Sequence, residues 1–334
     1  MLKKLLLLVA ILSLGLLMAC SSETGGESSS EEVKKLKLAH NLSEDHPIHT
    51  ALTSFAEDIE EKTDGSITFE IFSNGVLGSE QEVLEQMQSG SVDVTKVSAG
   101  ALESFSDDYS VFSLPYIFTS EEHYRNVMES DVVEEIYQST EDNNFIGLSY
   151  FDSGARSFYT KDTPVETPED LDGLLIRVMD SPTAIEMIEL LGGTPTPLAY
   201  GEVYTALQQG VIDGAESNPT ALTTGQHGEV SKAFSYTEHT NIPDIVVIRK
   251  DIWDSFSDEE KQIFEETANE ARVEHTDLWN KAIEEAVTEA EGMGVEFYDV
   301  DKEPFIELVQ PLHDKYSENE RLGELIERIN ELDK

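Results

Sequence analysis

The residue in this sequence that is best placed to do chemistry is Arg177, a single charged residue inside an apolar stretch. Residues 174–178 read Leu-Leu-Ile-Arg-Val, which is typical of a buried strand, so we expect the Arg177 side chain to face a partly buried site. A buried guanidinium is costly without a partner, and its planar fork binds a carboxylate through two parallel hydrogen bonds. That carboxylate belongs either to one of the chain's 68 acidic residues or to a bound ligand.

Motifs for catalysis or metal binding are missing from the sequence. It contains no GxSxG nucleophile elbow, no phosphate-binding or dinucleotide-binding glycine loop, no HExxH and no complete EF-hand loop. His46 and His49 are three residues apart, but Pro47 predicts a helix N-terminus, with His46 near the cap and His49 in the first turn. We therefore expect no metal, no cofactor and no catalytic residue.

The only cysteine, Cys20, follows an apolar run that begins after two lysines. Lys3 and Lys4, the uncharged residues 5–17 and the small residue Ala19 have the order of a secretory signal, which predicts a signal peptide over residues 1–19. A cysteine at the cleavage point resembles the bacterial lipobox, in which the thiol is acylated. The alternative is an ordinary signal peptide with an incidental cysteine. Residues 20–35, rich in Ser and Glu, then predict a flexible tether, so we expect an extracytoplasmic protein anchored by Cys20 to the outer face of the cell membrane.

The composition excludes several classes of function. The formal net charge is −46, so binding to nucleic acid or to anionic lipid through a basic surface is not expected, and the lipid at Cys20 is the predicted membrane contact. No cysteine follows Cys20, which leaves no disulfide, thiol nucleophile or cysteine metal site beyond it. The length of 334 residues suits two domains with ordinary apolar cores.

Alternating strand and helix patterns predict an α/β fold that positions these side chains. The first part of the chain has a strand, helix, strand, helix, strand order, at residues 36–40, 48–62, 67–72, 79–89 and 92–97. The pattern resumes with a helix at 121–139, strands at 145–151 and 174–178, helices at 182–191 and 201–209, and a strand at 244–249. Ser257 and Glu260 form a predicted capping box for one long helix to about residue 292, and a strand at 295–298 and two amphipathic helices follow.

Several ordered sequence blocks resemble the DctP-type solute-binding proteins of tripartite ATP-independent periplasmic (TRAP) transporters. They are LPYIF at 114–118, GAR at 154–156, DLDGLLIRV at 170–178, LGGTPTP at 191–197, GEVYTALQ at 201–208 and GVIDGAE at 210–216. Weaker similarity extends over nearly all of residues 36–329. So many blocks at the right separations are more specific than any single motif in the chain.

This resemblance implies a two-domain α/β clamp of the periplasmic-binding-protein kind (type II-like), with the long helix spanning both domains. The chain crosses between the domains more than once, so the implied first domain is 36–153 plus about 243–275, and the second is 154–242 plus about 276–334. In this family the arginine of the Ile-Arg-Val block pairs with the ligand carboxylate. That position is Arg177.

Other polar residues are candidates for ligand contacts. Arg156, expected in a short polar turn, is similar to a family arginine that supports the acidic end of the ligand, and Asn218 lies near a ligand-facing asparagine, with Ser217 as its rival. Strand ends at an interdomain crevice are where ligands bind in such sheets, which adds Asn41, Lys96 and Ser98. Asp152 or Glu216 could accept hydrogen bonds from ligand hydroxyls.

The function implied is capture of a small organic acid and its delivery to TRAP transporter membrane subunits, without chemistry. The run from 151 to 159 and Thr237-Glu238-His239 are most similar to members that take sugar acids such as hexuronates. C4-dicarboxylates are the alternative, and they would need a second cation opposite Arg177, for which Lys96 is the candidate. A secreted hydrolase of acidic sugars would need a recognisable catalytic carboxylate pair. A ligand-sensing module would need a signalling segment after the clamp, and we expect neither.

Overall fold

The computed structural model describes residues 33–333 of the chain. Cys20, the predicted signal peptide at 1–19 and most of the predicted tether lie outside these residues. None of the helices between residues 33 and 333 has both the length and the apolar character needed to cross a membrane.

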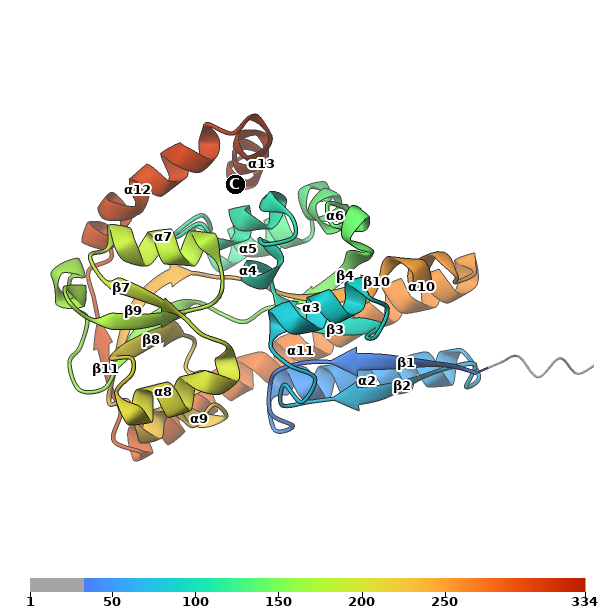
Figure 1. Cartoon of the computed structure of the whole chain (residues 1–334), viewed down its shortest axis with the longest axis horizontal. Helices are drawn as coiled ribbons and strands as arrows, with labels where there is room; N and C mark the ends of the chain where they lie inside the picture. The colour runs from blue at the N-terminus through green and yellow to red at the C-terminus, as the bar shows by residue number, and fades with distance from the viewer. Residues whose placement is uncertain (1–32, 334) are drawn as a thin grey trace, which may run out of the picture. The chain divides into compact units, whose positions relative to one another are not determined.

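The first of two sheets has five strands in the order β2-β1-β3-β10-β4 (Figure 1). β1 pairs in parallel with β2 and β3, while β10 runs antiparallel to β3 and β4. The strands are β1 (Lys34–Ala39), β2 (Ile67–Phe72), β3 (Val94–Ser98), β4 (Phe145–Phe151) and β10 (Asp244–Arg249). The helices next to them in sequence are α2 (Pro47–Lys62), α3 (Glu80–Gln88), α4 (Ala99–Leu102), α5 (Glu121–Met128), α6 (Asp131–Gln138) and α10 (Lys250–Asp254), with a 3-10 helix η1 (Asp107–Ser113).

The second sheet has six strands in the order β11-β9-β5-β8-β6-β7. β5 runs antiparallel to β8 and β9, and the other pairs are parallel. The strands are β5 (Arg156–Thr160), β6 (Leu175–Val178), β7 (Thr194–Pro197), β8 (Gly214–Ser217), β9 (Ala233–Thr240) and β11 (Glu296–Asp299). The accompanying helices are α7 (Pro182–Leu190), α8 (Val203–Gln209), α9 (Thr220–Thr223), α12 (Glu303–Ser317) and α13 (Glu320–Asn330).

Between residues 33 and 333 the chain passes from one sheet to the other three times: from β4 to β5, from β9 to β10, and along α11 (Asp258–Gly292) to β11. At the first crossing Gly154 has φ +64°, and a Cβ there would lie 3.3 Å from the Trp279 indole nitrogen on α11. Glycine provides both the left-handed backbone and the space that this close approach needs.

The predicted long helix is confirmed as α11, which has 35 residues. Ser257 caps it, since the Glu260 amide donates to the Ser257 hydroxyl and the Glu260 carboxylate accepts from the Ser257 amide, as predicted. α11 packs against α2 and β4 near its start and against α9 near its end (Figure 1). The α/β fold with two sheets and a spanning helix is thus confirmed, while the residue limits of the two domains stay a prediction.

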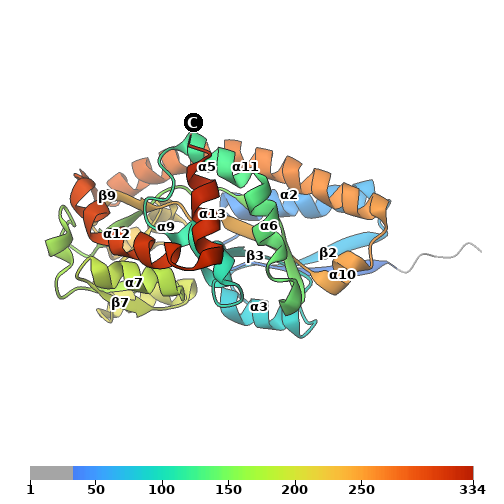
Figure 2. The same ribbon diagram turned by 90° about the horizontal axis from the view of Figure 1, so that it is seen from above.

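One apolar core runs without a break from the first sheet to the second. It packs Val97, Tyr150 and Ile245 of the first sheet in the same cluster as Phe158 and Ile176 of the second. α13 lies against α6 and η1, and α12 lies against α7, so the C-terminal helices cover this shared core (Figure 2). Separate clusters fill the other face of each sheet, under α2 and α11 in one and under α8 in the other.

Several predicted elements differ from those observed. The helix predicted at 121–139 is two helices, because Ser130 lies between α5 and α6. The prediction of a turn around Arg156 is wrong, because Arg156 is the first residue of strand β5. The side chains of Phe158 and Tyr159 in this strand pack into apolar cores on opposite faces of the sheet, which favours an extended backbone. The strands β5, β7, β8 and β9 were not predicted.

Candidate functional site

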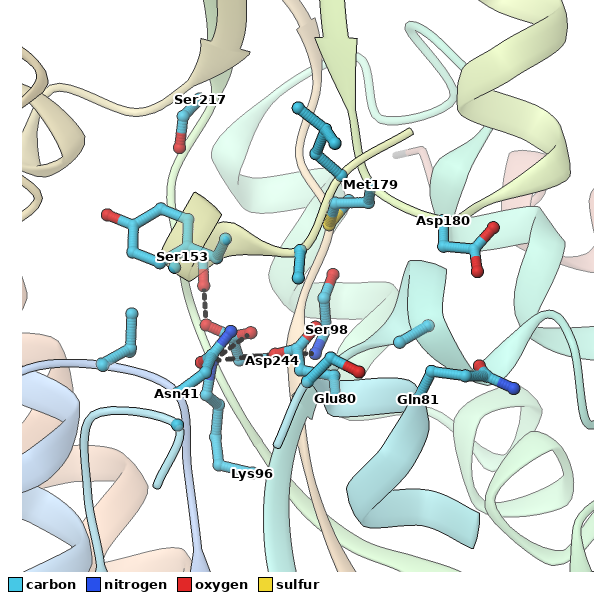
Figure 3. Close-up of a pocket in the computed structure, with 18 of the residues that line it drawn as sticks. Asn41, Glu80, Gln81, Lys96, Ser98, Ser153, Met179, Asp180, Ser217 and Asp244 are labelled. Carbon is cyan, nitrogen blue, oxygen red and sulfur yellow. Dashed lines mark hydrogen bonds and ion pairs between the residues drawn. The ribbon is translucent and has the colours of Figure 1, made fainter. Parts of the chain in front are cut away.

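A cavity of about 680 Å³ is lined by residues from both sheets and from α11 (Figure 3). Most of the polar side chains that line it come from strands or from the first residues after them. Among them are Asn41, Lys96, Ser98 and Asp244 from the first sheet and Arg156, Arg177, Ser217 and Asn218 from the second, and Glu80 joins them from the start of α3. Six of the eight predicted ligand-binding residues therefore line one cavity.

Arg177 is a buried guanidinium for which no carboxylate partner exists among residues 33–333. Only 4% of its surface is exposed, and its Nε and Nη2 both donate to the Leu198 carbonyl, at 2.9 and 2.8 Å. Burial lowers the pKa of Arg177, although Glu216 counteracts this. The sequence left open whether Arg177 pairs with an acidic residue of the chain or with a ligand. Within the described residues it forms no salt bridge, and its guanidinium lines the cavity.

Arg156, in contrast, is paired inside the protein. Its Nε and Nη2 donate to the two carboxylate oxygens of Glu216, at 2.5 and 2.8 Å, and Nη2 also reaches the Glu216 carbonyl at 2.7 Å. Burial alone would raise the pKa of Glu216, but the Arg156 guanidinium and the His239 imidazole, whose Nε2 lies 3.6 Å from Glu216 Oε2, lower it to about 2. Glu216 therefore holds Arg156 in place at the cavity wall.

The Lys96 cluster, which consists of Glu80, Lys96 and Asp244, forms the wall on the side of the first sheet (Figure 3). The Lys96 ammonium lies 3.0 Å from Asp244 Oδ1 and 3.5 Å from Glu80 Oε1, and all three groups are shielded from solvent. Ser153 donates to Asp244, and the Ser98 amide donates to Glu80 Oε1 at 3.2 Å. Burial opposes the charge on Lys96, but the two carboxylates raise its pKa, so it stays protonated.

Three of the smaller polar side chains that line the cavity, Asn41, Ser217 and Asn218, differ in their hydrogen bonding. Both ends of the Asn218 amide are occupied, since Nδ2 donates to the Ser153 carbonyl and Oδ1 accepts from the amide and hydroxyl of Thr220. Within residues 33–333 the Ser217 hydroxyl has no hydrogen bond, and Asn41 Oδ1 is buried without a partner. Ser217 and Asn41 are thus better able than Asn218 to form new hydrogen bonds.

Two of the predicted ligand-binding residues do not line the cavity. Glu216 lies behind Arg156, as described above. Asp152 accepts a hydrogen bond from the Gly154 amide at 2.8 Å, and burial raises its pKa. Their direct contact with a ligand stays a prediction.

Sequence reasoning missed several cavity residues. Glu80 and Asp244 are among them, although a charged residue at the start of the apolar strand 244–249 is a signal like that of Arg177. It also missed His46 and Trp279, which line the cavity and whose ring centroids are 5.9 Å apart. His46 caps α2 as predicted, and burial lowers its pKa to about 3, so its ring is neutral. Within the described residues, no cluster of three or more metal-ligating side chains exists.

A family model described as bacterial extracellular solute-binding protein, family 7 (DctP) matches residues 38–319. The chain belongs to this family. It is 44% identical to the protein YiiZ of Salmonella typhimurium, over 90% of this chain and 92% of that protein. A solute-binding protein of Chromohalobacter salexigens is 36% identical, over 86% of each chain.

Solved structures of family members share the fold. A TRAP periplasmic solute-binding protein from Anaerococcus prevotii, with bound α/β-D-glucuronate, is 38% identical and has a TM-score of 0.88, with 90% of this chain and 98% of that chain covered. One from Xanthobacter autotrophicus, with bound β-D-galacturonate, is 34% identical with a TM-score of 0.85, over 88% of this chain and 98% of that chain. The predicted family is confirmed, and so is the prediction that this DctP-family chain is an extracytoplasmic binding protein and not an enzyme.

Proposed function

We propose that this protein captures a sugar acid of the hexuronate type and delivers it to the membrane subunits of a TRAP transporter. The observation that carries the proposal is Arg177, whose buried charge faces the cavity with no carboxylate partner within the described residues. A ligand carboxylate supplies that partner, and bidentate pairing with a guanidinium selects a planar anion. The similar structures with bound glucuronate and galacturonate support this ligand class.

C4-dicarboxylate binding is the second candidate, because a relative from Rhodobacter capsulatus, 28% identical, is named for it. It requires a free cation opposite Arg177. Lys96 was the candidate, but its ammonium already contacts the carboxylates of Glu80 and Asp244. The geometry of the cavity therefore favours a monocarboxylate.

The test is a thermal-shift screen against D-glucuronate, D-galacturonate, succinate, malate and glucose, followed by calorimetry. A ligand that binds only the folded state raises the melting temperature. We expect both uronates to raise it and succinate, malate and glucose to leave it unchanged. A shift with succinate or malate alone would contradict the proposal.

We also propose that Cys20 carries the lipid that holds the protein at the outer face of the membrane. The signal pattern of residues 1–19 and the tether after them support this. In cells, Cys20→Ser should move the protein from the membrane fraction to the soluble fraction or the medium. Retention of the Cys20→Ser protein in the membrane would contradict a lipid anchor.

A further inference from the structure

The Lys96 cluster lies in the same cavity as Arg177 but differs from it in chemistry. Arg177 offers an unneutralised positive charge, whereas Lys96 is shared between two carboxylates within 3.5 Å. Figure 3 shows Asn41, Glu80, Lys96, Ser98 and Asp244 gathered on one side of the cavity, with Ser217 and Met179 on the other. A ligand that spans this space meets different chemistry at its two ends.

The Lys96 cluster has more hydrogen-bond acceptors than donors. Glu80 Oε1 accepts from Lys96 and from the Ser98 amide, but Glu80 Oε2 accepts no hydrogen bond from residues 33–333. Asn41 Oδ1, which lines the same cavity, is buried without a partner. Carboxylate and amide oxygens each have about two acceptor sites. Glu80 Oε2 and Asn41 Oδ1 can therefore still accept hydrogen bonds from a ligand.

Ligand hydroxyl groups can form the hydrogen bonds that the Lys96 cluster offers, whereas a second ligand carboxylate cannot. A hydroxyl donates to a carboxylate and can accept from an ammonium at the same time, which gives charge-assisted hydrogen bonds. A ligand carboxylate has no proton to donate, and at this wall it would lie beside two buried carboxylates of the same charge.

We propose that the Glu80–Lys96–Asp244 cluster is the specificity-determining wall of the cavity, which binds ring hydroxyls at the end of the ligand opposite its carboxylate. The proposal rests on the proposed function, in which Arg177 holds that carboxylate. It makes Glu80 the residue that distinguishes a polyhydroxylated monocarboxylate from a dicarboxylate. Asp244 and Lys96 contribute to the same wall but also hold each other and Ser153, so Glu80 is the cleaner position to test.

The experiment is calorimetric titration of the wild type and Glu80→Gln with D-glucuronate, with glucuronate analogues that lack single ring hydroxyls, and with succinate. Glu85→Gln is the matched control, because Glu85 is exposed on the same helix α3 and is not a cavity residue. A hydrogen bond to a charged group corresponds to roughly a 10- to 100-fold change in Kd. We expect a loss of this size for Glu80→Gln with glucuronate, and wild-type affinity for Glu85→Gln.

The analogues decide whether Glu80 acts through a hydroxyl. At least one should bind the wild type roughly 10- to 100-fold more weakly than glucuronate, and removal of the same hydroxyl should have little further effect in Glu80→Gln. Equal losses in both proteins, or wild-type affinity for glucuronate in Glu80→Gln, would overturn the proposal. If Glu80→Gln does not fold, full affinity of the wild type for every analogue would overturn it as well.

The outcomes separate this inference from the proposed function. A wild type that binds succinate and no uronate contradicts the function itself. A wild type that binds glucuronate, with no coupling between Glu80 and any hydroxyl, contradicts only the specificity wall.

Discussion

The two sheets are joined in two regions that are built in opposite ways. At the cavity, the side chains that face each other are charged, and Arg177 has no carboxylate partner among residues 33–333. In the shared core, apolar side chains run from one sheet to the other around one buried carboxylate, Glu103. Both oxygens of this carboxylate have partners: Ser181 donates to Glu103 Oε1 at 2.8 Å, and the Thr183 amide and hydroxyl donate to Oε2 at 3.2 and 2.9 Å.

This difference indicates how stability and binding are divided. Polar groups that are fully satisfied inside the protein stabilise the fold, whereas a buried charge left without a partner gives its interaction energy to the ligand. Changes in the cavity should therefore affect affinity, and changes in the shared core should affect the free energy of unfolding.

The largest expected effect is the loss of affinity in Arg177→Ala. Removal of one member of a desolvated charge pair costs about 2–5 kcal/mol, which is roughly 30-fold to several thousand-fold in Kd. Arg177→Lys should recover little, because lysine cannot pair in a bidentate way. Without ligand, we expect the free energy of unfolding of Arg177→Ala to stay within about 1 kcal/mol of the wild type.

Calorimetry for binding and urea denaturation for stability measure both effects. Arg125→Ala is the control, because Arg125 is an exposed arginine on α5. Near-wild-type binding by Arg177→Ala would mean that the ligand carboxylate lies elsewhere.

The reverse pattern is expected for Glu103→Gln. The amide has only one acceptor oxygen for three donors, so at least one buried donor loses its partner, at a cost of about 1–3 kcal/mol in the free energy of unfolding. Affinity for the ligand should change less than about threefold, since the lost contacts are not in the cavity. Urea denaturation of Glu103→Gln and of Glu265→Gln, an exposed glutamate on α11, tests this. A large loss of affinity with no loss of stability would break the division between the two regions.

Acid should destabilise the protein through buried histidines near the cavity. His227 is an example: burial, and then the Arg177 charge, lower its pKa from 6.5 to about 3. The unfolded chain therefore takes up a proton on this histidine before the folded chain does, so stability falls as the pH decreases from about 6.5 towards 3. Glu103 has the opposite sign, because burial raises its pKa and the folded state keeps the proton more readily.

We expect His227→Gln to reduce the difference in unfolding free energy between pH 7.5 and pH 5.0 by about 1–2 kcal/mol. Urea denaturation of both proteins at the two pH values measures this. An unchanged difference would mean that the pKa of His227 is the same in the folded and unfolded states, which would contradict the effect of burial. Arg177→Ala should raise the pKa of His227, which NMR titration of the imidazole can detect.

The smallest expected effect concerns the rate of ligand association. With a formal net charge of −46, the protein repels an anion at long range, and a Debye length of about 10 Å at 0.1 M salt screens this repulsion. The association rate should therefore rise as salt increases from very dilute to moderate, while the dissociation rate changes little. Stopped-flow measurements at several salt concentrations test this. A steady fall in the association rate would mean that the positive charge of Arg177 governs approach.

The sequence predicted local features of the fold well because they depend on neighbouring residues. The capping box of Ser257 and Glu260 and the His46 cap follow from residues within one helical turn, and both were predicted. β7 was missed because its sequence, Thr-Pro-Thr-Pro, contains two prolines, which a strand tolerates only at an edge such as the one where β7 lies. That position depends on the whole sheet.

A site residue could be predicted from the sequence where a charged residue interrupts an apolar strand, as Arg177 does. The pairing of Lys96 with Asp244 was not predictable, because the two residues are 148 positions apart. They meet because β3 and β10 are antiparallel with Asp244 opposite Ser98, which places Lys96 diagonally across from Asp244 on the same face. The sequence shows neither this strand order nor this register.

The long helix α11 has a mechanical consequence. With 35 residues and a rise of about 1.5 Å per residue, it is a rod roughly 50 Å long that is packed at one end on α2 and at the other on α9. The distance between its two ends is set by backbone hydrogen bonds and not by the ligand. Two fluorophores at the ends of α11 should therefore keep a constant energy-transfer efficiency, a built-in reference for a second pair placed across the mouth of the cavity.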